Sequence, residues 1–224
     1  MTLLWGIPVV LSLGLLLFFR MNIGRRLAHR SLPKPNLSDP NNWTIGPVVN
    51  GENVSDNMSV HLGPGFVIDM PTPTSQPHYV TVDYGPLTGK SKLTIHVRLD
   101  GGPFYAKDGT SQASLCLYFQ RRYDDWRATE SNPPQLSDTE SFRWYATGSA
   151  LLPLTVGDFT VTANLTDKWT ATAYSDSFMK AEAFKMAVDD AGEVGFVLGG
   201  GDGWGHGIMS PNPSKITVTG FVIE

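Results

Sequence analysis

Cysteine is nearly absent from this sequence, and its scarcity excludes two common ways of stabilising a small domain. Cys116 is the single cysteine among 224 residues, so neither an intrachain disulfide nor a cysteine-ligated metal cluster is available. Cys116 falls in the apolar run from Ser114 to Phe119, which reads as a strand. We therefore expect a buried, unreactive thiol.

A large charge excess of one sign is also missing. The chain has 17 Lys and Arg against 21 Asp and Glu, for a net charge of -4, and both signs are scattered along it. Phosphate backbones are bound by basic stripes, and none is present. Nucleic acid is therefore excluded as a partner.

Patterns that would indicate catalysis or a histidine metal site are lacking as well. None of the five histidines lies two or four residues from another. The adjacent pairs Asp124-Asp125 and Asp189-Asp190 do not place two carboxylates on one side of a strand, and no nucleophile-elbow motif occurs. The sequence thus predicts no catalytic residue and no enzyme.

What the chain does have is one long apolar run, from Thr2 to Phe19, which is closed by Arg20 and followed by a basic flank. A helix of about 18 residues can cross the ~30 Å hydrocarbon core of a bilayer. We predict that residues 1–20 are an uncleaved transmembrane anchor, because they lack a basic start and a small-residue cleavage site. Two alternatives stay open: a cleaved, signal-like segment, or a chain that starts at Met21.

The domain organisation follows from this anchor. Residues 21–40 are predicted to be a basic, proline-containing linker, and residues 41–224 a single domain. We expect a single-pass membrane protein whose domain lies outside the cytoplasm. The orientation stays open, because the Lys and Arg excess after the apolar run favours the cytoplasmic side for the domain.

Residues 41–224 show the alternation typical of antiparallel strands with one buried face. In Lys92 to Asp100, every second residue from Leu93 to Leu99 is apolar, whereas His96 and Arg98 point the other way. The other predicted strands are Phe66 to Met70, Tyr79 to Tyr84, Ser114 to Arg121, Phe142 to Ala146, Phe159 to Thr166, Gly195 to Leu198 and Lys215 to Ile223. The predicted fold class is all-β: an antiparallel β-sandwich of jelly-roll type.

One segment and one glycine break this pattern. Asp176 to Ala191 has apolar residues three and four apart, which predicts an amphipathic helix capped by Asp176 or Ser177 and ended by Gly192. In the last strand the apolar phase shifts across Gly220, which predicts a β-bulge there.

The loop from Gly199 to Gly207 is the richest candidate site, because it combines six glycines with Asp202, Trp204 and His206. A phosphate site is rejected, since a turn at Pro211 follows where a helix start is needed. Two interpretations remain. Either the loop is a wide hairpin with Trp204 folded over the edge of the core, or Trp204 stacks on a sugar whose hydroxyl groups contact Asp202 and His206.

Several features follow one another near the C-terminus: the predicted helix, the segment Val194 to Gly200, the segment Gly205 to Gly207, and the strand Ile216 to Ile223. This order resembles the closing section of galactose-binding-like jelly rolls, the fold of many carbohydrate-binding modules. The resemblance implies a ligand-binding β-sandwich, commonly for glycans, although a fold alone does not determine function.

A second candidate surface consists of side chains out of phase with the core positions of their strands, namely His96, Arg98, Tyr118, Arg143 and Tyr145. We expect them either to line a concave, ligand-binding sheet face or to form an ordinary polar exterior. A structural calcium, held by Asp100, Asp108 and nearby carbonyl groups, is the only cofactor that the sequence leaves open.

Together these features predict a membrane-tethered, non-catalytic binding module whose partner is a glycan or cell-surface polysaccharide. The alternative is a structural or protein-interaction domain without a small-molecule ligand. The exposure of Trp204 discriminates between them, because a buried indole with an internally bonded N–H favours the alternative.

Overall fold

The alternating segments form strands in the computed structural model, which describes residues 33–45, 58–60, 65–70, 77–122, 124, 142–148, 150–172, 175–200 and 204–224. Contacts gather Pro35–Glu224 into one compact unit. The predicted anchor from Thr2 to Phe19, and Asp202, lie outside the described residues. Within the described ranges, no helix is long and apolar enough to cross a membrane.

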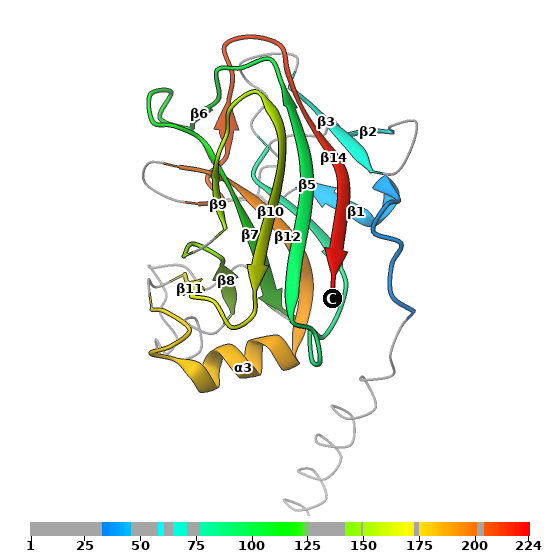
Figure 1. Ribbon diagram of the computed structural model, residues 1–224, viewed down its shortest axis with the longest axis vertical. Helices are drawn as coiled ribbons and strands as arrows, with labels where there is room; N and C mark the ends of the chain where they lie inside the picture. The colour runs from blue at the N-terminus through cyan, green and yellow to red at the C-terminus, as the bar shows by residue number, and fades with distance from the viewer. Residues whose placement is uncertain are drawn as a thin grey trace, which may run out of the picture. The chain divides into compact units, whose positions relative to one another are not determined.

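The strands form a seven-stranded sheet, a five-stranded sheet and a short two-stranded ladder (Figure 1). The order in the seven-stranded sheet is β1 (Trp43–Ile45), β4 (Tyr79–Asp83), β12 (Ala191–Gly199), β7 (Ser114–Arg121), β8 (Arg143–Tyr145) and β11 (Thr170–Ala171), with β9 (Leu151–Pro153) paired to β7. The order in the five-stranded sheet is β10 (Gly157–Asn164), β5 (Lys92–Asp100), β14 (Ser214–Ile223), β3 (Phe66–Met70) and β2 (Met58–Val60). The ladder joins β6 (Tyr105–Ala106) to β13 (Ile208–Met209), and a short 3-10 helix, η1 (Pro40–Asn42), precedes β1.

The paired strands of the described ranges are all antiparallel, so the predicted β-sandwich is confirmed. β3, β5 and β7 have the bounds expected from the sequence. The predicted bulge is also present, because the register of β14 against β5 shifts between Val218 and Gly220. Cys116 is fully buried, and burial raises the pKa of its thiol, as expected for an unreactive cysteine.

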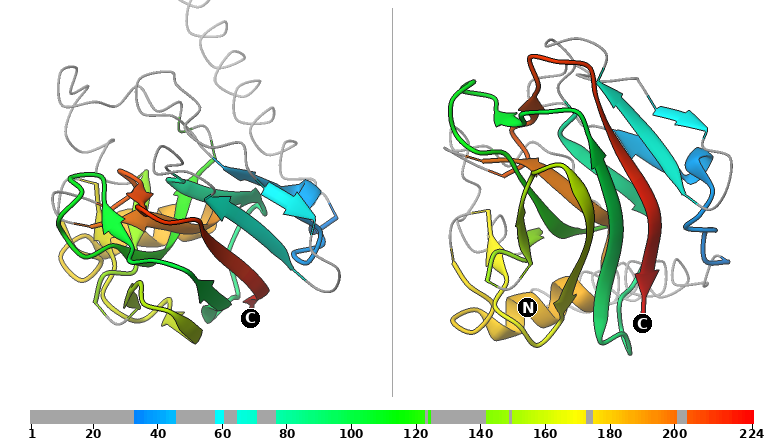
Figure 2. Two further views of the ribbon diagram at one scale, coloured as in Figure 1. Left: turned by 90° about the horizontal axis from the view of Figure 1, so that it is seen from above. Right: turned by 45° about the horizontal axis from the view of Figure 1, so that its top comes forward.

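The core lies between the two large sheets, which form two layers (Figure 2). Trp43, from β1 of the seven-stranded sheet, shows how the layers meet. The ring centroid of Trp43 lies 5.0 Å from that of Phe66 and 5.1 Å from that of Phe221, both in the five-stranded sheet. Its own sheet contributes Phe196, at 6.3 Å.

The predicted helix is shorter than its apolar spacing indicated. α3 spans Ala181–Asp189, whereas Asp176 accepts backbone N–H bonds from Phe178 and Met179 in a preceding turn. Phe178, expected in the core, is therefore 65% exposed. Ala191 and Gly192, expected at the helix end, belong to β12, because the chain passes directly from the helix into a bulged strand.

α3 covers one end of the sandwich (Figure 1). Phe184 is its main anchor: its ring lies 4.9 Å from Trp144 and 5.7 Å from Phe119. The β6–β13 ladder lies toward the other end, away from this helix.

Candidate functional site

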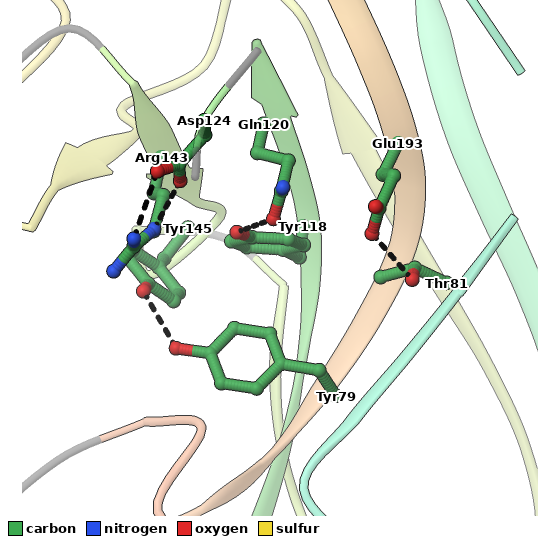
Figure 3. Close-up of polar contacts among 8 residues, drawn as sticks. All are labelled: Tyr79, Thr81, Tyr118, Gln120, Asp124, Arg143, Tyr145 and Glu193. Atoms are coloured by element: carbon green, nitrogen blue, oxygen red, sulfur yellow. Dashed lines mark hydrogen bonds and ion pairs between the residues drawn. The ribbon is translucent and has the colours of Figure 1, made fainter. Parts of the chain in front are cut away.

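The outer face of the seven-stranded sheet carries tyrosines and polar side chains in register. Thr81 pairs with Gly195, Gly195 with Tyr118, and Tyr118 with Tyr145, so these residues form one row across the sheet. Neighbouring rows add further side chains to the same face. We define the tyrosine face as Tyr79, Thr81, Tyr118, Gln120, Arg143, Tyr145 and Glu193, with Asp124 bound at its edge (Figure 3).

Three tyrosines pack together at the centre of this face. The Tyr118 ring lies 5.1 Å from the rings of both Tyr79 and Tyr145. The hydroxyl groups of Tyr79 and Tyr145 are 2.9 Å apart and share a hydrogen bond. Burial raises the pKa values of Tyr79 and Tyr118 well above the ordinary value for tyrosine, so both hydroxyl groups stay protonated.

Polar contacts complete the network. The Tyr118 hydroxyl donates to Oε1 of Gln120 over 2.5 Å. Arg143 donates from both Nε and Nη2 to the two carboxylate oxygens of Asp124, the Nη2 to Oδ1 distance being 2.9 Å. Burial opposes the charge of Arg143, but its contacts with Asp124 outweigh this effect and raise its pKa.

The burial of this network corrects one expectation from the sequence. Tyr118, Arg143 and Tyr145 were predicted to be solvent-facing, yet they are 0%, 9% and 7% exposed. Their strands do alternate, so these side chains point away from the intersheet core. Alternation identifies the face of a sheet, however, and does not show whether that face is covered.

Trp204 lies beside this network, at its rim. Its ring is 6.4 Å from that of Tyr145, tilted by 35°, and the residue is half-buried. Its indole N–H makes no hydrogen bond to a described residue. Trp204 thus packs on the core, as the hairpin interpretation expects, but it is only half-buried, as the sugar-binding interpretation requires.

The two glycines that follow let the loop lie directly on aromatic rings. Gly205 has φ +78, and a Cβ there would fall 2.3 Å from the Tyr79 hydroxyl oxygen. Gly207 has φ +90, and a Cβ there would fall 2.4 Å from Nε2 of His78. His206, between them, is exposed. Backbone bonds fix the arrangement, since the N–H of Gly207 donates to the carbonyl of Leu198 over 3.0 Å.

The structure divides the predicted site residues between two surfaces. His96 and Arg98 lie in β5, on the outer face of the five-stranded sheet, and so do not join Trp204. Nδ1 of His96 lies 2.8 Å from Oγ1 of Thr160, and Arg98 pairs with Asp100 at 3.2 Å. These two side chains form cross-strand and same-strand polar contacts, the ordinary exterior that was the alternative expectation.

Asp108, one of the two predicted calcium ligands, is engaged within its own turn. Its carboxylate accepts a hydrogen bond from the Ser111 hydroxyl and from the backbone N–H groups of Thr110, at 2.9 Å, and Ser111, at 2.8 Å, and these bonds lower its pKa to about 2. Asp100 pairs with Arg98 instead. Across the described ranges, no three acidic, histidine or cysteine side chains gather in a group that could hold a metal ion. Calcium binding stays a prediction.

His78 is the site residue that the sequence did not reveal. It is 4% exposed, and neither ring nitrogen has a hydrogen-bond partner. Burial lowers its pKa to about 4, repulsion from Lys107 and His206 acts in the same direction, and the nearby Gly205 backbone opposes them. No spacing pattern could indicate this residue, because its contact with Gly207 joins segments far apart in the chain.

Glu193→Gln is expected to stabilise the protein at neutral pH. Burial raises the pKa of Glu193, and the bond from the Thr81 hydroxyl, 2.8 Å long, only partly offsets this. The pKa of Glu193 in the folded state exceeds its unfolded value of about 4.3, so the contribution of this residue to stability is fully present below about pH 4.3. That contribution is lost as the pH rises through the folded-state pKa. Glutamine cannot ionise and avoids this loss.

Thermal melts of the full-length chain in mild detergent check this expectation at about pH 4 and about pH 8. The gain in Tm should be larger at the higher pH. Glu182→Gln, which removes the same charge from an exposed position of α3, is the control. An equal gain for Glu193→Gln at both pH values would contradict the assignment.

No protein-family model matches this sequence, and no curated protein sequence matches it. Among solved structures, the chain is similar to a xylan-binding module, CBM15, with 13% identity and a TM-score of 0.41, covering 83% of this chain and 95% of that one. It is also similar to a mutant of Xylanase10C from Cellvibrio japonicus in complex with xylopentaose, with 14% identity and a TM-score of 0.40, covering 85% of this chain and 28% of that one.

Proposed function

We propose that this protein is a non-catalytic carbohydrate-binding module that holds a glycan against Trp204. The observation that carries the proposal is the half-buried indole of Trp204, packed on Tyr145 with its N–H bonded to no described residue. A sugar ring has an apolar C–H face and a hydroxylated rim. A half-buried aromatic ring that packs on the protein suits that face.

The tyrosine face supports Trp204 from behind. Tyr145 is held by Tyr79 through their shared hydrogen bond and by packing on Tyr118. Because this network is buried and internally bonded, it fixes the Trp204 ring in place before a ligand binds. The predicted ligand contacts His206 and Asp202 belong to the same loop as Trp204.

We also propose that the apolar run from Thr2 to Phe19 tethers this module to a membrane, with the domain outside the cytoplasm. The support is the length and composition of that run. We also propose that the strands of the β-sandwich are connected as in a jelly roll. The glycan would then be a cell-surface polysaccharide.

Trp204→Ala is expected to weaken glycan binding about thirtyfold or more, because loss of an aromatic anchor costs about 2 kcal/mol or more. The ligand can be found with a glycan array that includes xylan, using the full-length chain in detergent micelles. Isothermal titration then compares wild type and variant. A thermal melt run in parallel shows whether the fold persists.

Phe178→Ala is the matched control, since it removes an exposed aromatic ring from the helical end of the sandwich. It should leave glycan affinity unchanged. Wild-type affinity in a folded Trp204→Ala variant would overturn the stacking role. The absence of binding to every glycan on the array would overturn the proposed function.

A protein-interaction domain is the second candidate, and the surface near α3 favours it. Phe178, Met179 and Met186 are 65%, 77% and 55% exposed, an unusual concentration of large apolar side chains. This candidate predicts that the wild type binds no glycan, and that replacing these three residues with serine leaves the melting temperature nearly unchanged.

A further inference from the structure

Basic side chains from three segments converge at Gly207. In the β6–β13 ladder Ile208 pairs with Ala106 and Met209 with Tyr105, and Lys107 and Gly207 directly adjoin the first of these pairs. Gly207 also lies on the His78 ring, as its close approach to Nε2 shows. His206 precedes Gly207 in the chain.

These basic groups lack counter-charges among the described residues. Lys107 and His206 are exposed, and neither forms an ion pair or a hydrogen bond with a described residue. Neither ring nitrogen of buried His78 makes a well-formed hydrogen bond to a described residue, although the Gly205 backbone lies near enough to raise its pKa. Asp108, the acidic neighbour of Lys107, is turned toward the N–H groups of Thr110 and Ser111.

The electrostatics agree with this placement. His78 is affected by the charges of both Lys107 and His206, and both act to lower its pKa. Lys107 therefore places a positive charge near His78 and His206 in a protein whose net charge is -4. A buried donor without a partner is costly, whereas the exposed Lys107 and His206 are hydrated and accessible to a ligand.

We propose that the glycan bound at Trp204 is acidic, and that one anionic sugar group, a carboxylate or a sulfate ester, binds between Lys107 and His206. This inference rests on the proposed function. Trp204 and His206 flank Gly205, so the stacking ring and the anion-binding group belong to one short loop.

The test compares acidic oligosaccharides with neutral forms of the same backbone, using the full-length chain in detergent micelles. The pairs are tetragalacturonate and its carboxyl-reduced form, glucuronate-substituted xylotetraose and plain xylotetraose, and a sulfated galactan tetrasaccharide and its desulfated form. In the backbone that binds, the acidic member should bind about tenfold more tightly, as one charge-assisted contact allows. The pair that shows the preference distinguishes carboxylate from sulfate.

Lys107→Gln and His206→Gln should each remove most of this preference without changing the melting temperature, because both side chains are exposed. Lys185→Gln is the matched control: it removes one exposed positive charge from α3, at the other end of the sandwich. It should leave the preference intact. A further readout is the imidazole NMR signal of His78, which should shift with the acidic member of the pair and not with the neutral one.

Two results would overturn the inference and leave the proposed function standing: equal affinity for both members of a pair that binds through Trp204, or an acidic preference that persists in both glutamine variants. The absence of binding to any oligosaccharide, together with a negative glycan array, would overturn both proposals.

Discussion

Arg143→Met is expected to lower the free energy of unfolding by about 3–5 kcal/mol, the cost of breaking a buried ion pair from one side. The Asp124 side chain is 1% exposed and that of Arg143 is 11% exposed, so water cannot readily replace the lost guanidinium. Methionine fills similar space, which isolates the effect of the charge. Urea denaturation of the full-length chain in detergent, with the slope checked for two-state behaviour, measures the change.

Lys215→Met provides the comparison, because it also removes one cation from an ion pair. Lys215 lies 3.6 Å from Asp69, and their side chains are 61% and 32% exposed, so the change should cost only about 0–1 kcal/mol. Equal costs for the two variants would mean that the Arg143–Asp124 contact is solvated and does not hold the tyrosine face together. Arg143→Met should also weaken glycan binding, because Arg143 belongs to β8 together with Tyr145, on which Trp204 packs.

The strands could be predicted because a buried face imposes a period of two on the sequence. Lys92–Asp100 shows this most clearly: Leu93, Ile95, Val97 and Leu99 face the core, and the strand has the expected bounds. The bulge at Gly220 could be predicted for the same reason, since an extra residue must shift the phase of the pattern.

The candidate site could be predicted only in part, because its residues are brought together by contacts between distant segments. Trp204 and His206 were identified by the unusual glycine content of their loop. His96 and Arg98 share a strand face but lie on the other sheet, a separation that depends on strand order and leaves no local signal. His78 and Lys107 meet Gly207 only through the folding of β4 and the β6–β13 ladder.

The burial of the tyrosine face could not be predicted from the sequence either. Alternation correctly placed Tyr118 and Tyr145 on one face, opposite to the core. Whether such a face meets water depends on what packs over it, and tyrosine occurs both on exposed sheet faces and in buried, hydrogen-bonded networks. The partners of these tyrosines, Tyr79 and Gln120, could not be read from a local pattern.

Gly205→Ala is expected to destabilise the protein by about 2–5 kcal/mol and to abolish glycan binding. The left-handed backbone at φ +78 costs a non-glycine residue about 1–2 kcal/mol. The new Cβ would also fall 2.3 Å from the Tyr79 hydroxyl oxygen, and such overpacking typically costs about 1–3 kcal/mol. Displacement of Tyr79 would disturb its bond to Tyr145, on which Trp204 rests.

Gly89→Ala separates the two contributions. Gly89 has φ +77, nearly the same as Gly205, but a Cβ there would meet nothing within 4 Å. It should therefore cost only the backbone penalty of about 1–2 kcal/mol and leave glycan affinity unchanged. Paired urea denaturation and titration of the two variants measure both effects. Suppose that Gly205→Ala lowers the free energy of unfolding no more than Gly89→Ala does and still binds glycan. The loop would then not rest on Tyr79, and the tyrosine face would not support Trp204.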